Sequence, residues 1–219
     1  MTVKNKYYSN SGNVNVINAV PGLAESVLDV GCGAGDNARI LKELGKTVDG
    51  ITLTESEAAE AGKYCRKVFV HDIENGLPPG LEEKYDTVIC SHVLEHLRFP
   101  QKVLADIRQR LKNSSQLIVA LPNIMVYKYR LKLLLGKFEY EEGGVMDDTH
   151  FRWYTFKSGK KLLEDNGFSV IKAWVDGGVP FGRISKFLNP VTQKGIKKIL
   201  FSISPGFFGG ELLYQAKVK

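Results

Sequence analysis

A glycine-rich segment near the N-terminus, residues 27–35, has the residue types of a nucleotide-binding turn. An apolar run reaches Asp29 and leads into Gly31, Gly33 and Gly35. Glycine tolerates positive φ angles and lets a ligand lie against main-chain atoms. A helical pattern follows at once, and the N–H groups at a helix start favour polar or anionic groups. We therefore expect a nucleotide-type cofactor at this turn.

Three of the four histidines lie in two segments that could carry acid–base or metal chemistry. His92, Glu95 and His96 would share one face if their segment were helical. His150 lies later, in an Asp-Asp-Thr-His run. Our leading interpretation makes His150 or His92 a general base for a hydroxyl proton, since imidazole titrates near neutral pH.

Two other interpretations of these four side chains stay open. In one, they hold a divalent metal that acidifies the hydroxyl. Imidazole and carboxylate ligands would suit zinc, manganese, iron or cobalt better than magnesium. In the other, Glu95 and His96 only fix a loop by hydrogen bonds.

Strand and helix patterns alternate along the chain, which predicts an α/β fold with a mostly parallel, Rossmann-like sheet. In such sheets ligands bind beyond the carboxyl ends of the strands, where the candidate residues fall. The expected strands are residues 26–30, 47–53, 67–70, 85–91, 116–121, 168–175 and 212–218. The expected helices are residues 14–20, 37–44, 55–63, 100–111 and 155–166.

The chain of 219 residues is expected to form one domain with three distinct segments. Residues 1–25 precede the sheet. Residues 122–154 break the alternation and are expected to lie as an insertion over the acceptor site. Residues 176–219 form a basic C-terminal region.

Composition indicates an ordinary globular protein, with 43% hydrophobic and 25% charged residues. No apolar run is long enough to span a membrane, and no signal-peptide pattern is present. Cys32, Cys65 and Cys90 fit neither a metal knuckle nor a disulfide framework. We therefore expect a cytoplasmic protein.

The net charge of +6 is concentrated near the C-terminus. From Arg183 onward there are seven basic residues and one acidic residue, whereas the preceding residues are balanced. Such a region can attract phosphate-bearing partners or a membrane surface, or can simply keep the protein soluble. Without a basic surface elsewhere, we do not expect nucleic-acid binding.

The run Leu-Asp-Val-Gly-Cys-Gly-Ala-Gly over residues 28–35 resembles the first motif of class I S-adenosylmethionine-dependent methyltransferases. The resemblance implies S-adenosylmethionine as cofactor and a seven-stranded sheet whose last strand is antiparallel. It also assigns cofactor contacts along the chain. These are Asp29, Gly31, Cys32, Gly33, Gly35, Asp72, Ile73 and Ser91.

Three of these positions have separate roles by resemblance. Asp72 would accept a hydrogen bond from the adenine amino group, and the Ile73 N–H would lie near a ring nitrogen. Ser91 would flank the methionine part, together with His92. The segment from Tyr85 resembles the family's Phe-Asp-x-Val motif.

The second expected strand departs from the family pattern. An acidic residue usually ends this strand and binds both ribose hydroxyls, but the matching position is Thr52. A similar pattern in cyclopropane fatty acid synthase-like methyltransferases has a ribose-binding glutamine five residues later. Here that position is Glu57, so we expect Thr52 and Glu57 to replace the usual acid. The competing interpretation is that Glu57 only caps a helix begun by Thr54.

The segment Thr-His-Phe-Arg-Trp-Tyr-Thr over residues 149–155 is similar to one in methyltransferases of sugars and surface polysaccharides. These enzymes and ubiquinone-type O-methyltransferases also share the Val-Leu-Glu-His-Leu run. Plant-type small-RNA methyltransferases carry Glu-x-x-Glu-His plus a distant histidine as a metal site, but His92 replaces the first glutamate here.

The resemblance predicts O-methylation of a small molecule, such as a sugar or polysaccharide intermediate linked to a diphosphate. Arg152 would bind an anionic group of that acceptor, and Tyr154 would stack on its ring. An RNA ribose methyltransferase and a non-catalytic cofactor-binding module are the alternatives.

Overall fold

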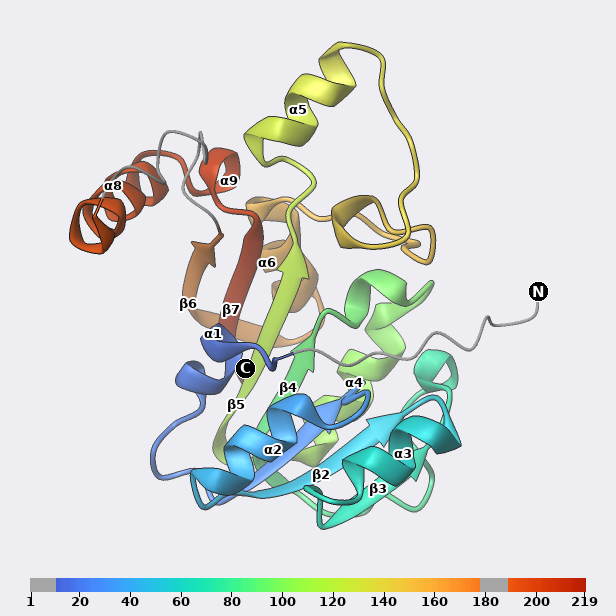
Figure 1. Ribbon diagram of the computed structural model, residues 1–219. Helices are drawn as coiled ribbons and strands as arrows, with labels where there is room; N and C mark the ends of the chain where they lie inside the picture. Colours follow the sequence, from blue (N-terminus) through green and yellow to red (C-terminus); the bar gives the residue numbers. More distant parts are fainter. Residues whose placement is uncertain (1–10, 178–188) are drawn as a thin grey trace.

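The computed structural model describes residues 11–177 and 189–219, which build one twisted sheet with helices on both faces (Figure 1). The seven strands have the order β3-β2-β1-β4-β5-β7-β6. All neighbours pair in parallel except β7, which is antiparallel to both β5 and β6. This confirms the expected Rossmann-like sheet and its antiparallel last strand.

The strands and helices follow the predicted alternation closely. The strands are β1 (Ser26–Val30), β2 (Thr47–Thr52), β3 (Lys67–Val70), β4 (Tyr85–Ser91), β5 (Leu111–Pro122), β6 (Phe168–Asp176) and β7 (Glu211–Val218). The helices are α1 (Val14–Ala19), α2 (Asp36–Glu43), α3 (Glu55–Ala61), α4 (Pro100–Arg110), α5 (Tyr127–Leu134), α6 (Phe156–Asp165), α8 (Pro190–Ile203) and α9 (Pro205–Phe208).

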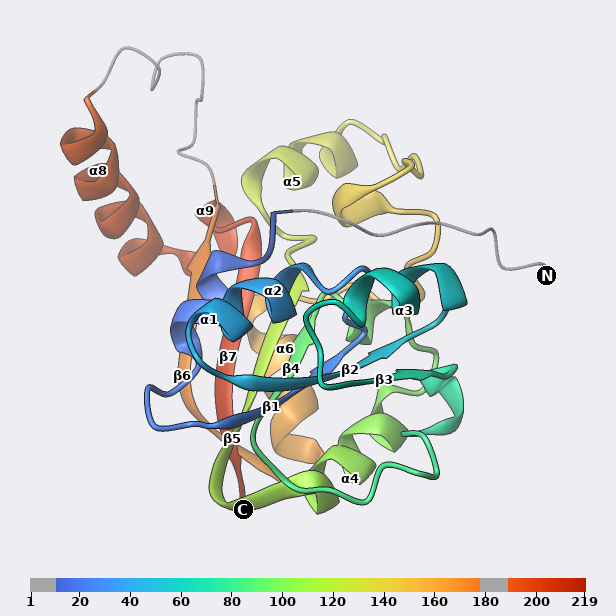
Figure 2. The same ribbon diagram turned by 60° about the horizontal axis from the view of Figure 1, so that its bottom comes forward.

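Helices lie on both faces of the sheet, as Figure 2 shows, and an apolar layer packs on each face. One layer joins the strands to α1, α2 and α3 through residues such as Val16, Leu41 and Ala61. The other joins them to α4 and α6 through residues such as Leu104 and Leu163. Because β1 is covered on both faces, its last four residues are all buried, and Asp29 is the one polar residue among them.

Two helices near the C-terminus were missed by the sequence analysis, which expected only a final strand there. The helix α8 begins at Pro190 after Asn189, whose side chain accepts a hydrogen bond from the Thr192 N–H at 2.8 Å. The asparagine and proline are a helix-start signal. None of the α8 residues is buried, and Figures 1 and 2 show the helix standing away from the sheet. Among the described residues, no helix has the length and apolarity needed to cross a membrane.

The fifth strand begins earlier than expected, at Leu111, where it pairs with Tyr85 of β4. The polar residues 112–115 have the composition of a turn, and the pairing with β4 passes over them, since Leu111 pairs with Tyr85 and Gln116 with Thr87. Ser114 has a φ of 66°, which marks the irregular pairing there.

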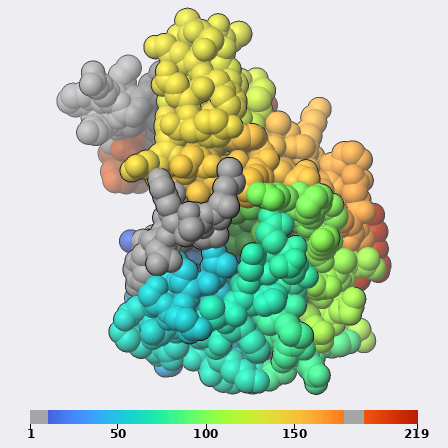
Figure 3. Space-filling model, turned by 90° about the vertical axis from the view of Figure 1, so that its right-hand side faces the viewer, coloured from blue at the N-terminus to red at the C-terminus, as the bar shows by residue number. Residues whose placement is uncertain are grey.

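The segment of residues 122–154 projects from the carboxyl end of β5. It holds α5, the 3-10 turn η3 (Gly144–Met146) and a small core of Val126, Tyr129, Val145 and Met146. In the space-filling view the yellow part of this segment stands clear of the cyan body (Figure 3).

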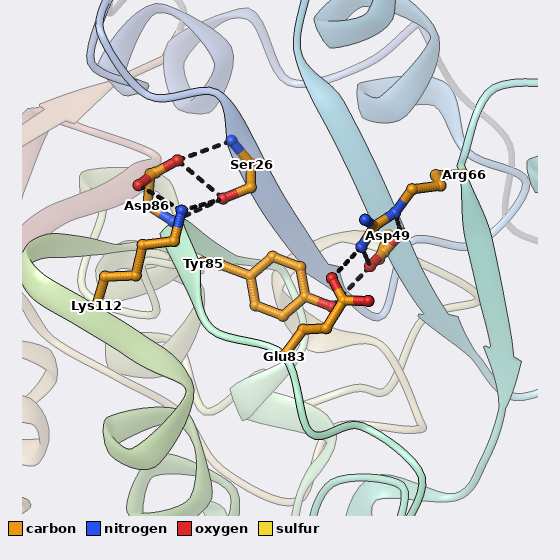
Figure 4. Close-up of polar contacts among 7 residues, drawn as sticks. All are labelled: Ser26, Asp49, Arg66, Glu83, Tyr85, Asp86 and Lys112. Carbon is orange, nitrogen blue, oxygen red and sulfur yellow. Dashed lines mark hydrogen bonds and ion pairs between the residues drawn. The ribbon is translucent and has the colours of Figure 1, made fainter.

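Two clusters of paired charges join the strands at the opposite, amino-terminal side of the sheet (Figure 4). Buried Asp49 of β2 accepts hydrogen bonds from Arg66 Nε at 3.0 Å and from the Tyr85 hydroxyl at 2.7 Å. Asp86 of β4 accepts from the Ser26 N–H at 2.9 Å and from Lys112 Nζ at 2.9 Å. The Tyr-Asp motif therefore ties β4 to its neighbours.

We expect Asp86→Asn to lower the free energy of unfolding by about 2 kcal/mol at pH 7, because charged hydrogen bonds are lost. Burial opposes ionisation of Asp86, but Lys112, Ser26 and Glu25 hold its pKa well below the usual range. Its stabilising effect is therefore complete above about pH 4 and declines as the pH falls further.

Urea unfolding of both proteins at several pH values measures this difference. The matched control is Asp165→Asn, which breaks an exposed pair with Lys161 on α6. The control should change stability by less than about 0.5 kcal/mol. An Asp86→Asn penalty that stays constant down to pH 2 would contradict the assignment.

Candidate functional site

The glycine turn between β1 and α2 has the backbone that its sequence requires. Gly31, Gly33 and Gly35 have φ angles of 74°, 52° and 85°. A Cβ atom on Gly31 would lie 2.4 Å from Val93 Cγ2, and one on Gly35 would lie 2.8 Å from the Ala61 Cα. Side chains at these positions would therefore clash with the loop after β4 and with α3.

The start of α2 lacks a side-chain cap, since Gly35 is its N-cap residue. The first N–H groups of a helix have no intrahelical acceptor and can bind a ligand. Cys32 lies inside this turn, where its N–H donates to the Ile51 carbonyl at 2.8 Å. This hydrogen bond holds the turn after β1 against β2, beside the candidate cofactor site.

Asp29 is a fully buried carboxylate at the base of the glycine turn. Neither carboxylate oxygen accepts a hydrogen bond from the described residues. Burial raises the pKa of Asp29 to about 7, although the side chain of Asn37 favours ionisation. A buried acceptor without a donor is costly. The contact of Asp29 with a cofactor stays a prediction.

Thr52 and Glu57 lie together at the end of β2, and both are buried. The Thr52 hydroxyl donates to Glu57 Oε2 at 2.6 Å, and the Thr54 hydroxyl lies 3.1 Å from the same oxygen. The Glu57 N–H also donates to the Thr54 hydroxyl at 3.3 Å, so Glu57 is part of a helix cap. Whether Glu57 also binds the ribose of the cofactor stays a prediction.

Asp72 and Ile73 follow β3 at the same edge of the sheet. The Asp72 carboxylate accepts a hydrogen bond from the Glu74 N–H at 3.0 Å and begins the 3-10 turn η1 (Ile73–Asn75). Asp72 is exposed. Its contact with adenine stays a prediction, and in this structure the carboxylate caps the start of η1.

His92 follows Ser91 at the end of β4 and has a φ of 55°, in the left-handed region. Its Nε2 lies 2.8 Å from Glu211 Oε1, and its Nδ1 lies 3.3 Å from Glu95 Oε1. Burial disfavours protonation, but these two carboxylates raise the pKa of His92 to about 10. An imidazolium has no lone pair for a proton or a metal. Both ring nitrogens of His92 face carboxylates, and its role as a base or a metal ligand stays a prediction.

The environment of His92 and Ser91 includes residues that the sequence analysis missed. The Asn13 amide donates to Glu211 Oε1 at 2.5 Å and to the Ser91 hydroxyl at 3.3 Å. The Asn15 amide donates to Glu211 Oε2 at 3.0 Å. Asn13 also caps α1, and that cap was its only signal in the sequence.

His96 and His150 meet at the same edge of the sheet, with ring centroids 4.6 Å apart. His96 lies in the 3-10 turn η2 (Leu94–His96), which is too short to present His92 on the same face. Burial lowers the pKa of His96, so its ring is neutral at neutral pH. Each of Glu95, His96 and His150 offers one ligand atom, and these atoms lie within 4.8 Å of one another. The structure thus brings together three of the four predicted side chains.

The main chain of Glu95 holds the second histidine segment in place. Its carbonyl accepts hydrogen bonds from the Phe151 and Arg152 N–H groups at 3.0 and 3.1 Å. The Arg152 guanidinium donates to the Arg98 carbonyl through Nε at 3.0 Å and Nη2 at 2.6 Å. Tyr154 is buried, and its hydroxyl makes no hydrogen bond to the described residues. Whether Arg152 and Tyr154 bind an acceptor stays a prediction.

Comparison with known proteins places this geometry in context. A family model described as a methyltransferase domain matches residues 7–173. The ubiquinone biosynthesis O-methyltransferase of Rickettsia canadensis is 29% identical over 149 residues, which span 66% of this chain and 62% of the relative. The protein of the same name from Pseudomonas savastanoi is 32% identical over 120 residues, or 50% of each chain. This chain therefore matches about half to three-fifths of the length of these relatives.

Solved structures support the fold. A SAM-dependent methyltransferase from Archaeoglobus fulgidus superposes with a TM-score of 0.64 at 22% identity, over 90% of this chain and 87% of that one. An S-adenosylmethionine-dependent methyltransferase from Clostridium acetobutylicum has a TM-score of 0.58 at 15% identity, over 89% and 84% of the two chains.

We expect Asp29→Asn to stabilise the protein by about 2 kcal/mol more at pH 8 than at pH 5. The unfolded carboxyl ionises near pH 4, whereas the folded one ionises near pH 7, so native stability falls between these values. The asparagine amide does not ionise, so the variant does not lose this stability as the pH rises. Urea unfolding at both pH values measures the difference, and an equal effect at the two would contradict the raised pKa.

We expect Glu57→Gln to weaken binding of S-adenosylhomocysteine about tenfold, because a charged hydrogen bond to the ribose becomes a neutral one. Calorimetric titration measures the affinity. Glu60→Gln on the same helix removes an exposed partner of Lys63 and serves as the control. If Glu57→Gln leaves the affinity unchanged, Glu57 has only the helix-capping role and does not bind the ribose.

Proposed function

Because this chain belongs to the family of methyltransferase domains, we propose that it transfers a methyl group from S-adenosylmethionine to a hydroxyl oxygen of a small molecule. This proposal depends mainly on one observation, the close approach of the buried Glu95 and His150 to the partly buried His96. They lie beside the glycine turn, since Val93, just before them in the chain, packs against Gly31.

The chain has to align the two reactants and remove one proton. S-adenosylmethionine, when bound, supplies a methyl group whose bond to the sulfonium sulfur breaks as a bond to the acceptor oxygen forms. Correct alignment alone provides much of the acceleration. The hydroxyl proton must also leave. We propose that it leaves at the cluster formed by Glu95, His96 and His150.

His150 is suited to this step by its tautomer. Its Nδ1 lies 3.1 Å from the Val145 carbonyl oxygen, which can only accept a hydrogen bond. Nδ1 therefore carries the proton, and Nε2 carries the lone pair. That lone pair is able to take the acceptor proton directly or to bind a cation that acidifies the hydroxyl.

Aromatic side chains beside His150 favour a ring-shaped acceptor such as a sugar. Trp153 Nε1 donates to the same Val145 carbonyl at 3.1 Å. The ring centroids of Phe138 and Tyr140 lie 5.9 and 6.1 Å from that of Trp153, and both rings are half exposed. Exposed aromatic faces stack on sugar rings through apolar contact.

The charge of the C-terminal helix supports a diphosphate-linked acceptor. Three lysines and no acidic residue lie in α8 (Pro190–Ile203). Positive charge of this kind raises the local concentration of phosphate-bearing ligands or of an anionic membrane surface. We therefore propose a sugar or polysaccharide intermediate, carried on a nucleotide or lipid diphosphate, as the acceptor.

We expect His150→Asn to lower kcat by at least about 100-fold, because general-acid–base groups contribute that much or more. Binding of S-adenosylhomocysteine should change less than about twofold, since His150 lies outside the glycine turn. A methyl-transfer assay with nucleotide-linked sugars measures the first quantity, and calorimetry measures the second.

The control for this experiment is His71→Asn, which replaces a histidine outside the group formed by Glu95, His96 and His150. It should retain both activity and cofactor binding. Full turnover by His150→Asn would contradict the placement of proton loss at the cluster. Cofactor binding without transfer to any hydroxyl acceptor would favour the non-catalytic alternative.

A further inference from the structure

The buried carboxylate of Glu95 has no partner at Oε2 among the described residues, and its Oε1 has one long contact, to His92. The side chain is fully buried, and neither oxygen accepts a hydrogen bond from the described residues. The nearest cation is His92, whose Nδ1 lies 3.3 Å from Oε1, and that ring is shared with Glu211. A buried carboxylate in this state is costly unless it is paired or coordinates a cation.

The tautomer of His96 follows from its neighbours. The Thr149 hydroxyl has one proton and lies 2.5 Å from Asp147 Oδ1, so it donates that proton to the carboxylate. His96 Nδ1, 3.0 Å from the same hydroxyl, must therefore be the donor in that contact. The lone pair of His96 is then on Nε2.

His150 has the same arrangement, with Nδ1 donating to the Val145 carbonyl. Metal-binding histidines usually donate their other ring N–H to a carbonyl or to a group held by a carboxylate. Here both rings are fixed in this way before any ligand binds. The Asp147–Thr149 pair and the Val145 carbonyl would form the outer shell of such a site.

We propose that Glu95, His96 and His150 bind one divalent transition-metal ion, such as zinc, manganese, iron or cobalt. Two imidazoles and one carboxylate are ligands of intermediate hardness, which suit these ions better than magnesium or calcium. Three protein ligands leave coordination positions open for an acceptor oxygen. This set excludes His92, because its two ring nitrogens face the carboxylates of Glu211 and Glu95 at 2.8 and 3.3 Å.

The role of the ion rests on the proposed function, but its binding does not. A divalent cation in this position lowers the pKa of a coordinated hydroxyl group and orients it toward the methyl donor. An acceptor with two neighbouring hydroxyl groups, as in a sugar, can fill two open positions. The site would then select among hydroxyl groups as well as activate one.

The test is metal titration of the full chain, freed of any histidine tag and stripped with a chelator. Calorimetry with Zn²⁺ and absorption spectroscopy with Co²⁺ should each give one ion per chain. Mg²⁺ should bind at least about 100-fold more weakly than Zn²⁺.

The variants Glu95→Gln and His96→Asn should each weaken Zn²⁺ binding at least about 100-fold. Both should keep their affinity for S-adenosylhomocysteine, which shows that they are folded. His71→Asn should bind Zn²⁺ as the parent protein does. No binding of any of these ions, or binding that the two cluster variants leave unchanged, would overturn the proposal.

Measuring methyl transfer with and without the ion distinguishes the role of the ion from the proposed function. Loss of methyl transfer on chelation, restored by added Mn²⁺ or Co²⁺, supports the role of the ion. Full turnover by the metal-free chain would contradict that role while leaving the proposed methyl transfer intact. An ion bound by the three residues, with no transfer to any acceptor, would contradict the proposed function alone.

Discussion

The parallel pairing of β1 with β2 and β4 is the constraint on which every candidate residue depends. The register aligns Val30 with Ile51 on one side and with Cys90 on the other. Parallel strands end at the same edge, so the glycine turn, Thr52 and His92 emerge side by side. Apolar layers on both faces hold this register in place.

Carboxylates at the two ends of the sheet differ in whether they have hydrogen-bond partners. At the amino-terminal side, Asp49 and Asp86 are paired with cations and hydroxyl groups, so they join strands together. At the carboxyl-terminal side, Asp29 and Glu95 are buried without hydrogen-bond donors among the described residues. Uncompensated charge costs stability. Its restriction to the edge beside the glycine turn is what a ligand site requires, because a ligand can supply the missing partner.

The candidate site also depends on the two ends of the described chain. Glu211 at the start of β7 and Asn13 before α1 contact each other and surround His92. The antiparallel strand β7 carries Glu211 to the edge where β4 ends. Against the effect of burial, the carboxylates of Glu211 and Glu95 raise the pKa of His92, whereas burial lowers the pKa of His96. Folding of the last strand is therefore needed to complete the chemistry of the site.

The sequence by itself determined the features that depend on local geometry. Gly31, Gly33 and Gly35 require positive φ, and alternating strand and helix patterns require a layered α/β fold. Only the tertiary structure decided which histidines meet: His96 lies beside His150, while His92 lies beside Glu211. These pairs are separated by more than fifty residues, and their protonation depends on burial and on neighbours that spacing along the chain does not specify.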